Sequence, residues 1–353
     1  MTKITRRTAL ASLGAFAGVA SLSGRNRAAA AEPLVISAPG VFLPEELKKR
    51  FTEETGIELK TTAWTSAPEM VTKALAGDQQ YDLLSLTEDW VQPLLGTDRL
   101  QPIDLDRVPN YAHVLDFFKK QTLSVHDGKR YALPHFWGFD SIVYNKKEIP
   151  GIESWAQLYD GTYKGRTAIR DDAGQGILIG ALAMGGFPDP NKLSTEDVTR
   201  IKEWLIARKP NLRTMWSSFA QGVSLLTSGE AWAVQGWMSM VPSALKANMS
   251  VGYARPREGS LAWNHSYVIN SNSRNLDAVY TFLDWILGEE ATTMVGKLAN
   301  YPSASTTGIK NFSKEEQELL GYDGVDRLMG TLYYRFPANL PTYIEAWSEF
   351  KNA

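Results

Sequence analysis

The chain has 353 residues, a net charge of −2 and no cysteine. Its 44% hydrophobic content is too high for a disordered chain, and its length suffices for two domains with full hydrophobic cores. The lack of cysteine excludes a disulfide framework and a lipid anchor built on cysteine.

The first 31 residues contain the three parts of an export signal. The pair Arg6 and Arg7 precedes a weakly hydrophobic stretch, 9–22, and the alanines at 28–31 offer a small-residue cleavage site. The stretch is shorter than the about 20 apolar residues that span a bilayer, and the arginine pair favours the twin-arginine (Tat) route. We therefore expect residues 1–31 to be a twin-arginine signal peptide and the periplasm to be the destination. An amphipathic N-terminal helix of the mature fold is the alternative.

Removal of this segment makes the rest of the chain more acidic. The segment takes five basic residues and no acid with it, so the remaining 322 residues carry a net charge of −7. This charge disfavours nucleic acid or an anionic membrane surface as a partner.

Strands and helices alternate at the start of the mature chain, which indicates a doubly wound α/β domain. In such sheets ligands bind beyond the carboxyl ends of the strands, which selects the loops 38–43, 63–67 and 87–90. The predicted elements are a strand at 34–37, a helix opened by Pro44 and stopped at Gly56, a strand at 57–61, a helix at 66–76 and a strand at 81–86.

A second α/β unit is expected to begin near Gly138. Its predicted elements are a strand at 141–145, a helix opened by Ser154 and Trp155, a strand at 166–170 and a helix at 174–184 capped by Asp172. Helical periodicity returns at 277–287 and 343–350. Without a linker in the sequence, the two lobes are expected to be joined by short crossing segments.

Several segments together resemble the bacterial extracellular solute-binding proteins of ABC importers, in the spermidine/putrescine-binding branch. This resemblance implies a two-lobed periplasmic binding protein fold (type II). Each lobe would be a doubly wound mixed sheet flanked by helices, and a hinge would close the ligand cleft between them. Lobe one would contain 32–137 plus 264–308, and lobe two 138–263 plus 309–353. The matching segments are 51–57, 81–83, 131–134, 137–138, 154–158, 163–165, 171–173, 228–230 and 301–302.

The resemblance also implies which residues bind the ligand. Gln175 and His265 stand where the family has acids, and a neutral imidazole cannot replace a carboxylate opposite an ammonium group. Pro39 offers no ring where the family has an aromatic residue, and a polar contact within 333–336 has no fixed position. The implied ligand-binding residues are Phe42, Thr87, Asp89, Asp172, Gln175, Trp237, Trp263, His265 and Tyr301.

Each assignment has a structural alternative. The two tryptophans could be core residues, Asp172 a helix cap, His265 a buried structural histidine, and Asp89 with its neighbour Glu88 solvated loop acids. Trp64 and Trp90 are further candidates for lining the cleft. Core positions are expected for Trp155, Trp232, Trp285 and Trp347.

The sequence therefore predicts a periplasmic substrate-binding component of an ABC transporter. It would act as a monomer without cofactor or metal, with a small-molecule ligand, the ABC permease and the Tat machinery as partners. A polyamine or smaller organic cation is the first choice of ligand, and an amino-acid-like, anionic or sugar solute is the alternative. The pair Tyr333 and Tyr334 resembles the tyrosines of ferric-ion-binding relatives. In this sequence no His, Asp or Glu ligands accompany the pair at a recognisable spacing, which disfavours an iron site. An enzyme is disfavoured because none of the four histidines has metal-binding or nucleophile-elbow spacing.

Overall fold

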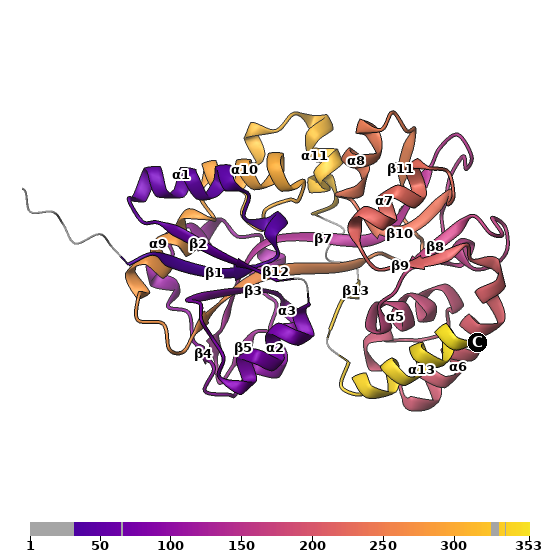
Figure 1. Cartoon of the computed structure of the whole chain (residues 1–353), viewed down its shortest axis with the longest axis horizontal. Coiled ribbons are helices and arrows are strands. Elements are labelled where there is room, and N and C mark those ends of the chain that lie inside the picture. Colours follow the sequence, from indigo (N-terminus) through magenta and orange to yellow (C-terminus); the bar gives the residue numbers. More distant parts are fainter. Residues whose placement is uncertain (1–31, 65, 326–331, 336) are drawn as a thin grey trace, which may run out of the picture. The chain divides into compact units, whose positions relative to one another are not determined.

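A computed structural model describes residues 32–353 except 65, 326–331 and 336 (Figure 1). The expected signal peptide lies outside the described residues. Within the described part, no helix is long and apolar enough to cross a membrane.

The described strands form one 11-stranded sheet and a separate two-stranded hairpin. The main path runs β2-β1-β3-β12-β7-β10-β8-β9. β1 is parallel to β2 and β3, and β8 is parallel to β9 and β10. The strands are β1 (Leu34–Ala38), β2 (Leu59–Ala63), β3 (Leu83–Thr87), β4 (Leu100–Gln101), β5 (Val125–His126), β6 (Lys129–Arg130), β7 (Ala132–Asn145), β8 (Thr167–Arg170), β9 (Thr214–Trp216), β10 (Ala233–Trp237), β11 (Val251–Tyr253), β12 (Leu261–Asn270) and β13 (Leu332–Tyr333).

The antiparallel strands β7 and β12 run through the middle of the molecule and belong to both halves of the sheet (Figure 1). β7 has 14 residues and is one continuous strand, whereas the sequence predicted a strand only from residue 141. Pro134, near the start of the strand, lies beside a register shift between His265 and Ser266 of β12. A bulge of this kind accommodates the proline, which cannot donate a ladder hydrogen bond.

Helices cover both faces of each half of the sheet (Figure 1). Two cap residues anticipated from the sequence are in place: Gly56 ends α1 with a φ of 72°, and the side chain of Asp172 caps α5. Ser66, expected as the first residue of a helix, is the N-cap of α2. The described helices are α1 (Glu45–Thr55), α2 (Ala67–Ala76), α3 (Glu88–Val91), α4 (Asp116–Lys119), α5 (Ala173–Met184), α6 (Thr195–Arg208), α7 (Phe219–Thr227), α8 (Met240–Lys246), α9 (Leu276–Trp285), α10 (Glu289–Ala299), α11 (Lys314–Leu320) and α13 (Leu340–Asn352).

The apolar core is divided between the two halves of the sheet. In one half, one layer packs β1 against α1, α9 and α10, and another packs β3 against α2. In the other half, α5, α6 and α13 cover one face and α7 and α8 the opposite face. Phe312, Leu320 and Tyr322 pack into the same core as β1. The lobe boundaries expected from the sequence stay a prediction.

Candidate functional site

Four of the expected ligand-binding residues form an aromatic cluster beside β12. The ring centroid of Phe42, in the turn after β1, lies 4.6 Å from His265 and 5.8 Å from Tyr301. The Trp263 ring lies 5.6 Å from Tyr301. Phe136 of β7 stacks at 5.0 Å on His265 and 5.2 Å on Tyr301. These rings form a continuous aromatic wall, with pair spacings at which aromatic rings attract each other.

Trp263 lies across the neighbouring strand because its opposite residue is a glycine. Gly138 of β7 pairs with Trp263 in the sheet register. A Cβ atom at position 138 would lie 2.6 Å from Cζ2 of the indole. The indole Nε1 is buried and has no hydrogen-bond partner within the described residues, so a donor remains available.

His265 is neutral in this environment. Its Nδ1 lies 3.3 Å from the hydroxyl of Ser85, which lies 3.3 Å from Nε2 of His135. Burial lowers the pKa of His265 to about 3, and it also lowers the pKa of His135. The His265 ring can therefore give or take a hydrogen bond, but it offers no charge to a ligand.

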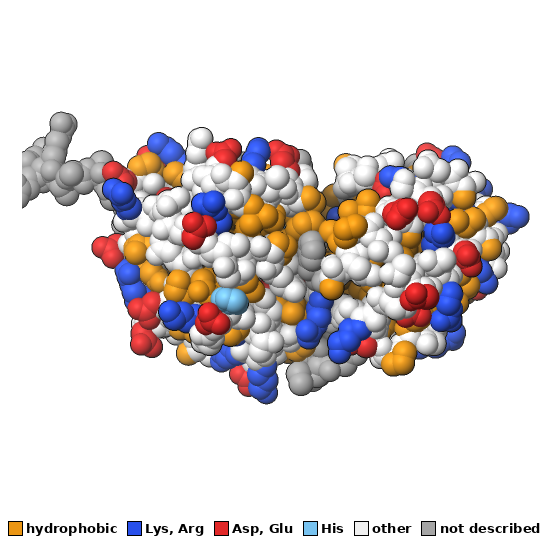
Figure 2. Space-filling model, turned by 90° about the horizontal axis from the view of Figure 1, so that it is seen from below, with side chains coloured by type: hydrophobic (Ala, Val, Ile, Leu, Met, Phe, Trp, Pro, Cys, Tyr) orange, Lys and Arg blue, Asp and Glu red, His pale blue; other side chains and the backbone are white. Residues whose placement is uncertain are grey.

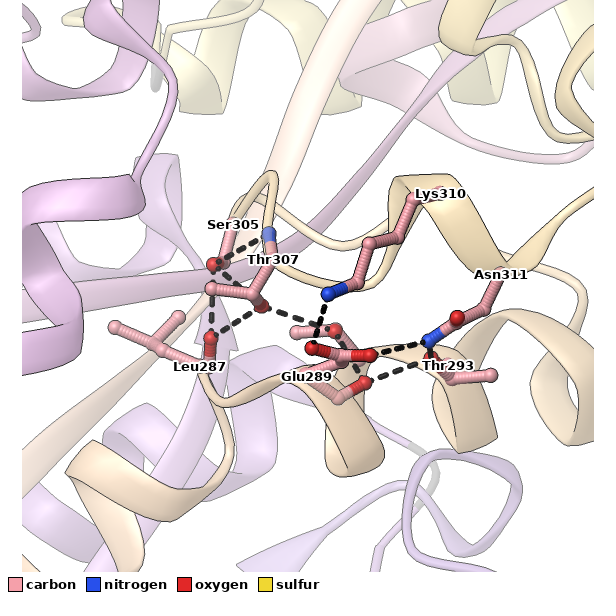
Figure 3. Close-up of polar contacts among 8 residues, drawn as sticks. Leu287, Glu289, Thr293, Ser305, Thr307, Lys310 and Asn311 are labelled. Atoms are coloured by element: carbon pink, nitrogen blue, oxygen red, sulfur yellow. Dashed lines mark hydrogen bonds and ion pairs between the residues drawn. The ribbon is translucent and has the colours of Figure 1, made fainter.

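The segment after Tyr301 is tied to the start of α10 (Figure 3). The hydroxyls of Ser305 and Thr307 each donate to the carbonyl of Leu287 at 2.8 Å. The ammonium of Lys310 lies 2.7 Å from the carboxylate of Glu289. These contacts fix the loop that carries the tyrosine.

The start of α5 brings three polar side chains together opposite the aromatic wall. The Asp172 carboxylate accepts from the backbone N–H of Gln175 at 2.9 Å, so its capping role is present. Arg170, which the sequence analysis did not select, lies 3.5 Å from Asp172 and donates to the Gln175 amide oxygen at 2.8 Å. Its guanidinium also lies 4.9 Å from the ring centroid of Trp237. One protein cation therefore already occupies part of this site.

The two sides of the site are connected. Ser239, just after β10, donates its hydroxyl to the Tyr301 hydroxyl at 2.9 Å. Thr87 lies opposite His265 in the sheet register. Burial raises the pKa of Asp89 to about 7, although the Thr87 hydroxyl and nearby backbone N–H groups lower it, and the charge of Asp172 raises it further. All nine expected residues thus lie in one region, called the central site below.

Glu88 and Asp89 are buried rather than solvated. Glu88 accepts hydrogen bonds from the hydroxyls of Ser124 at 2.6 Å and Tyr333 at 2.9 Å, so it holds the C-terminal segment in place. The hydroxyl of Tyr334 lies against Gly174 at the start of α5. The sequence could not place these two tyrosines, and the structure puts Tyr334 beside the central site.

Asp140 of β7 is the residue that sequence reasoning missed most clearly. Its side chain is fully buried, and neither carboxylate oxygen has a hydrogen-bond partner within the described residues. Burial raises its pKa to about 7, against the lowering effect of Arg170 and of the nearby Trp237 and Gln175 side chains. A detectable signal was present, because an acid within the run 139–143, which is otherwise largely apolar, is costly to bury without a partner.

The remaining tryptophans lie in or against the hydrophobic core. Trp155 and Trp347 are buried, as expected. Trp64 and Trp90, the two candidates for lining the cleft, pack against the core beside α2 and β3. Trp232 and Trp285 are partly buried against the other cores.

Two pockets elsewhere on the described surface are weaker candidates for a ligand site than the central site. A pocket of about 670 Å³ between α1 and α9 is bordered by charges that already pair, including Arg107 with Asp277 at 2.8 Å. Another pocket, of about 770 Å³, lies along α6 and α13. No group of three or more His, Asp or Glu residues in the described ranges could hold a metal ion.

The central site combines aromatic faces, buried carboxylates and a few hydrogen-bonding groups. Figure 2 shows that the surface is hollowed where the two halves of the molecule meet, with hydrophobic side chains on both sides. Such an arrangement can hold a small polar or cationic molecule by stacking, charge and hydrogen bonds.

Comparisons with known proteins agree with this chemistry. The profile of the family described as bacterial extracellular solute-binding protein matches residues 46–317. A putrescine/agmatine-binding protein of Pseudomonas aeruginosa is 26% identical over 335 residues, covering 88% of this chain and 89% of that protein. A putrescine/cadaverine-binding protein of the same organism is 26% identical over 294 residues, covering 78% and 81%.

The fold also matches solved structures. A spermidine/putrescine ABC transporter substrate-binding protein from Streptococcus pneumoniae superposes with a TM-score of 0.79 at 22% identity, covering 91% of this chain and 99% of that one. This likeness confirms the two-lobed α/β fold predicted from the sequence.

Proposed function

Because this chain belongs to the bacterial extracellular solute-binding proteins, we propose that it captures a small organic cation of the polyamine class between its lobes and delivers it to an ABC permease. The observation that carries this proposal is the gathering of an aromatic wall and buried acids at one central site. The names of the Pseudomonas relatives support the same ligand class.

The binding mechanism needs no covalent chemistry, in keeping with a family of binding proteins rather than enzymes. The alkyl chain of the ligand packs on the rings of Phe42, Trp263 and Tyr301, which attract its ammonium groups. Asp89 and Asp172 supply negative charge at the other side. Closure of the lobes removes water and strengthens these charge interactions, and the permease distinguishes the closed form from the open one.

The proposal extends to where and how the protein works. Residues 1–31 serve as a twin-arginine signal peptide, the Tat machinery exports the chain, and the mature protein acts as a monomer in the periplasm. The sequence pattern of this segment supports the route, and the family's extracellular role supports the destination.

A thermal-shift screen tests the ligand class. Putrescine, cadaverine, agmatine and spermidine should raise the melting temperature, whereas sugars and simple anions should leave it unchanged. A ligand at 100 times its dissociation constant stabilises the protein by about 2.7 kcal/mol. Stabilisation by sugars or anions but by none of the amines would contradict the proposal.

One observation favours a second candidate ligand class. Arg170 places a cation beside the acids of the central site, and a guanidinium is a good partner for a carboxylate. An amino-acid-like ligand with an ammonium and a carboxylate group would use both charges. Including γ-aminobutyrate, lysine and glutamate in the same screen separates this candidate from the diamines.

A further inference from the structure

We propose that Asp140 is a ligand-binding residue and that its carboxylate receives an ammonium group of the solute. This inference rests on the proposed function, because it concerns the same central site. It assigns the role to a residue on the shared strand β7, outside the set that the family resemblance selects.

The first argument is the burial of an unsatisfied acid. Asp140 is 0% exposed, and neither of its oxygens makes a hydrogen bond of normal geometry in the described part of the chain, although the Trp237 and Gln175 side chains lie close enough to lower its pKa. Buried polar groups nearly always have a partner, and an unpaired one costs stability. A carboxylate kept in this state is explained if its partner arrives with the ligand.

The second argument is direction. Asp140 pairs with Trp237 in the β7–β10 register. The pKa of its carboxyl group responds to Arg170, Asp172 and Gln175, so these side chains lie near it. These neighbours belong to the acidic side of the central site. The carboxylate therefore faces the region in which the ligand is expected.

The third argument is that the protein's own cation is already committed. Arg170 contacts Asp172 and Gln175 and lies over Trp237, whereas no ion pair joins it to Asp140. The charge of Arg170 only moderates the cost of burying Asp140. The structure thus retains an acid with which Arg170 forms no ion pair.

Asp140 also compensates for the loss of two acids that the family resemblance implies at the site. Gln175 and the neutral His265 occupy positions at which the family resemblance implies acids. Asp140 supplies a carboxylate from a different strand, close to Gln175. The recognised ammonium group would then lie deep against β7, with the aromatic wall beyond it.

The groups that set the ionisation of Asp140 come from several elements. They are Arg170 at the end of β8, Asp172 and Gln175 at the start of α5, Trp237 of β10, Tyr253 of β11 and Tyr301. With a pKa of about 7, Asp140 is half-protonated at neutral pH in the ligand-free protein. A cation binds the ionised form, so its affinity should increase as the pH rises from 5.5 to 8.

The main test is calorimetric titration of putrescine into wild type and Asp140→Asn at pH 8. The asparagine keeps the shape but removes the charge, and affinity should fall by about 30-fold or more. Asp171→Asn is the matched control, because it also removes the charge of an aspartate. The Asp171 carboxylate already forms an ion pair with Lys351 and accepts a hydrogen bond from Trp347. It should bind putrescine within about threefold of wild type.

Melting of the ligand-free proteins gives an independent result. A buried acid with a raised pKa destabilises the fold increasingly as pH rises from about 4 to 7. Asp140→Asn should therefore melt at a higher temperature than wild type at pH 8, and the difference should shrink towards pH 5. Destabilisation of Asp140→Asn at pH 8 would identify a structural partner of Arg170 and overturn the inference.

The outcomes separate this inference from the proposed function. Wild type that binds none of the amines contradicts the proposed function, and the ligand-free melting comparison then still decides whether Asp140 is a structural counter-charge. Equal putrescine affinity of wild type and Asp140→Asn overturns this inference alone. If Asp140→Asn does not fold, the putrescine affinity of Asp89→Asn is measured from pH 5.5 to 8. This variant lacks the other buried acid with a pKa of about 7, so any remaining rise in affinity is assigned to Asp140. A flat profile would overturn the inference.

Discussion

Replacing Gly138 with alanine should displace Trp263 and weaken ligand binding. The added Cβ would lie 2.6 Å from Cζ2 and 2.9 Å from Cη2 of the indole. Carbon atoms in contact normally lie about 3.5–4.0 Å apart, so the ring must retreat by about 1 Å. Overpacking of this kind costs about 1–3 kcal/mol, which corresponds to a lowering of the melting temperature by roughly 2–6 °C.

The effect on affinity follows from the contacts of the displaced ring. Loss of one favourable aromatic contact costs about 0.5–1.5 kcal/mol, which corresponds to roughly a 2- to 13-fold increase in the dissociation constant. Calorimetry with the best amine from the screen measures this change, and differential scanning calorimetry measures the stability.

Two variants control this experiment. Gly151→Ala adds the same methyl group where no atom lies within 4 Å, so it should be neutral or slightly stabilising. Trp263→Phe removes the atoms that collide, so Gly138→Ala should cost less in that background than in wild type. Wild-type melting and affinity of Gly138→Ala would refute the reasoning that the glycine makes room for the indole.

Three further predictions concern the charges of the site and the export signal. For a cationic ligand, Asp172→Asn should weaken binding more than Gln175→Ala, because a lost counter-charge costs about 2–5 kcal/mol and a neutral hydrogen bond about 1 kcal/mol; calorimetry showing the reverse order would indicate an anionic ligand. His265→Asp should raise the affinity for putrescine relative to a monoamine of similar length, because an acid replaces the neutral imidazole. An unchanged ratio of the two affinities would show that position 265 does not contact the second ammonium group of putrescine. Lysine at both Arg6 and Arg7 should leave the precursor in the cytoplasm, and normal periplasmic levels in a cell-fractionation assay would contradict the Tat route.

The sequence predicted best the features that depend on neighbouring residues. Gly56 and Asp172 are helix caps, and caps act within one turn of the chain. The continuity of β7 could not be predicted locally, because the irregularity that accommodates Pro134 is an extra residue, His135, in the pairing of β7 with β12, a strand far along the sequence. Asp140 was missed for the same reason: its importance depends on what surrounds it, and only the fold brings Arg170 and Trp237 close.

The pairing of β12 with β3 determines when the protein can fold. Thr87 lies beside His265, so the first half of the sheet stays open until about half the chain length has been added after β3. At synthesis rates of 5–20 residues per second this interval lasts roughly 9–36 s. During it, β3 has an unpaired edge that favours aggregation. Closing this long loop, rather than forming the local helices, should therefore limit the folding rate and make the nascent chain dependent on chaperones.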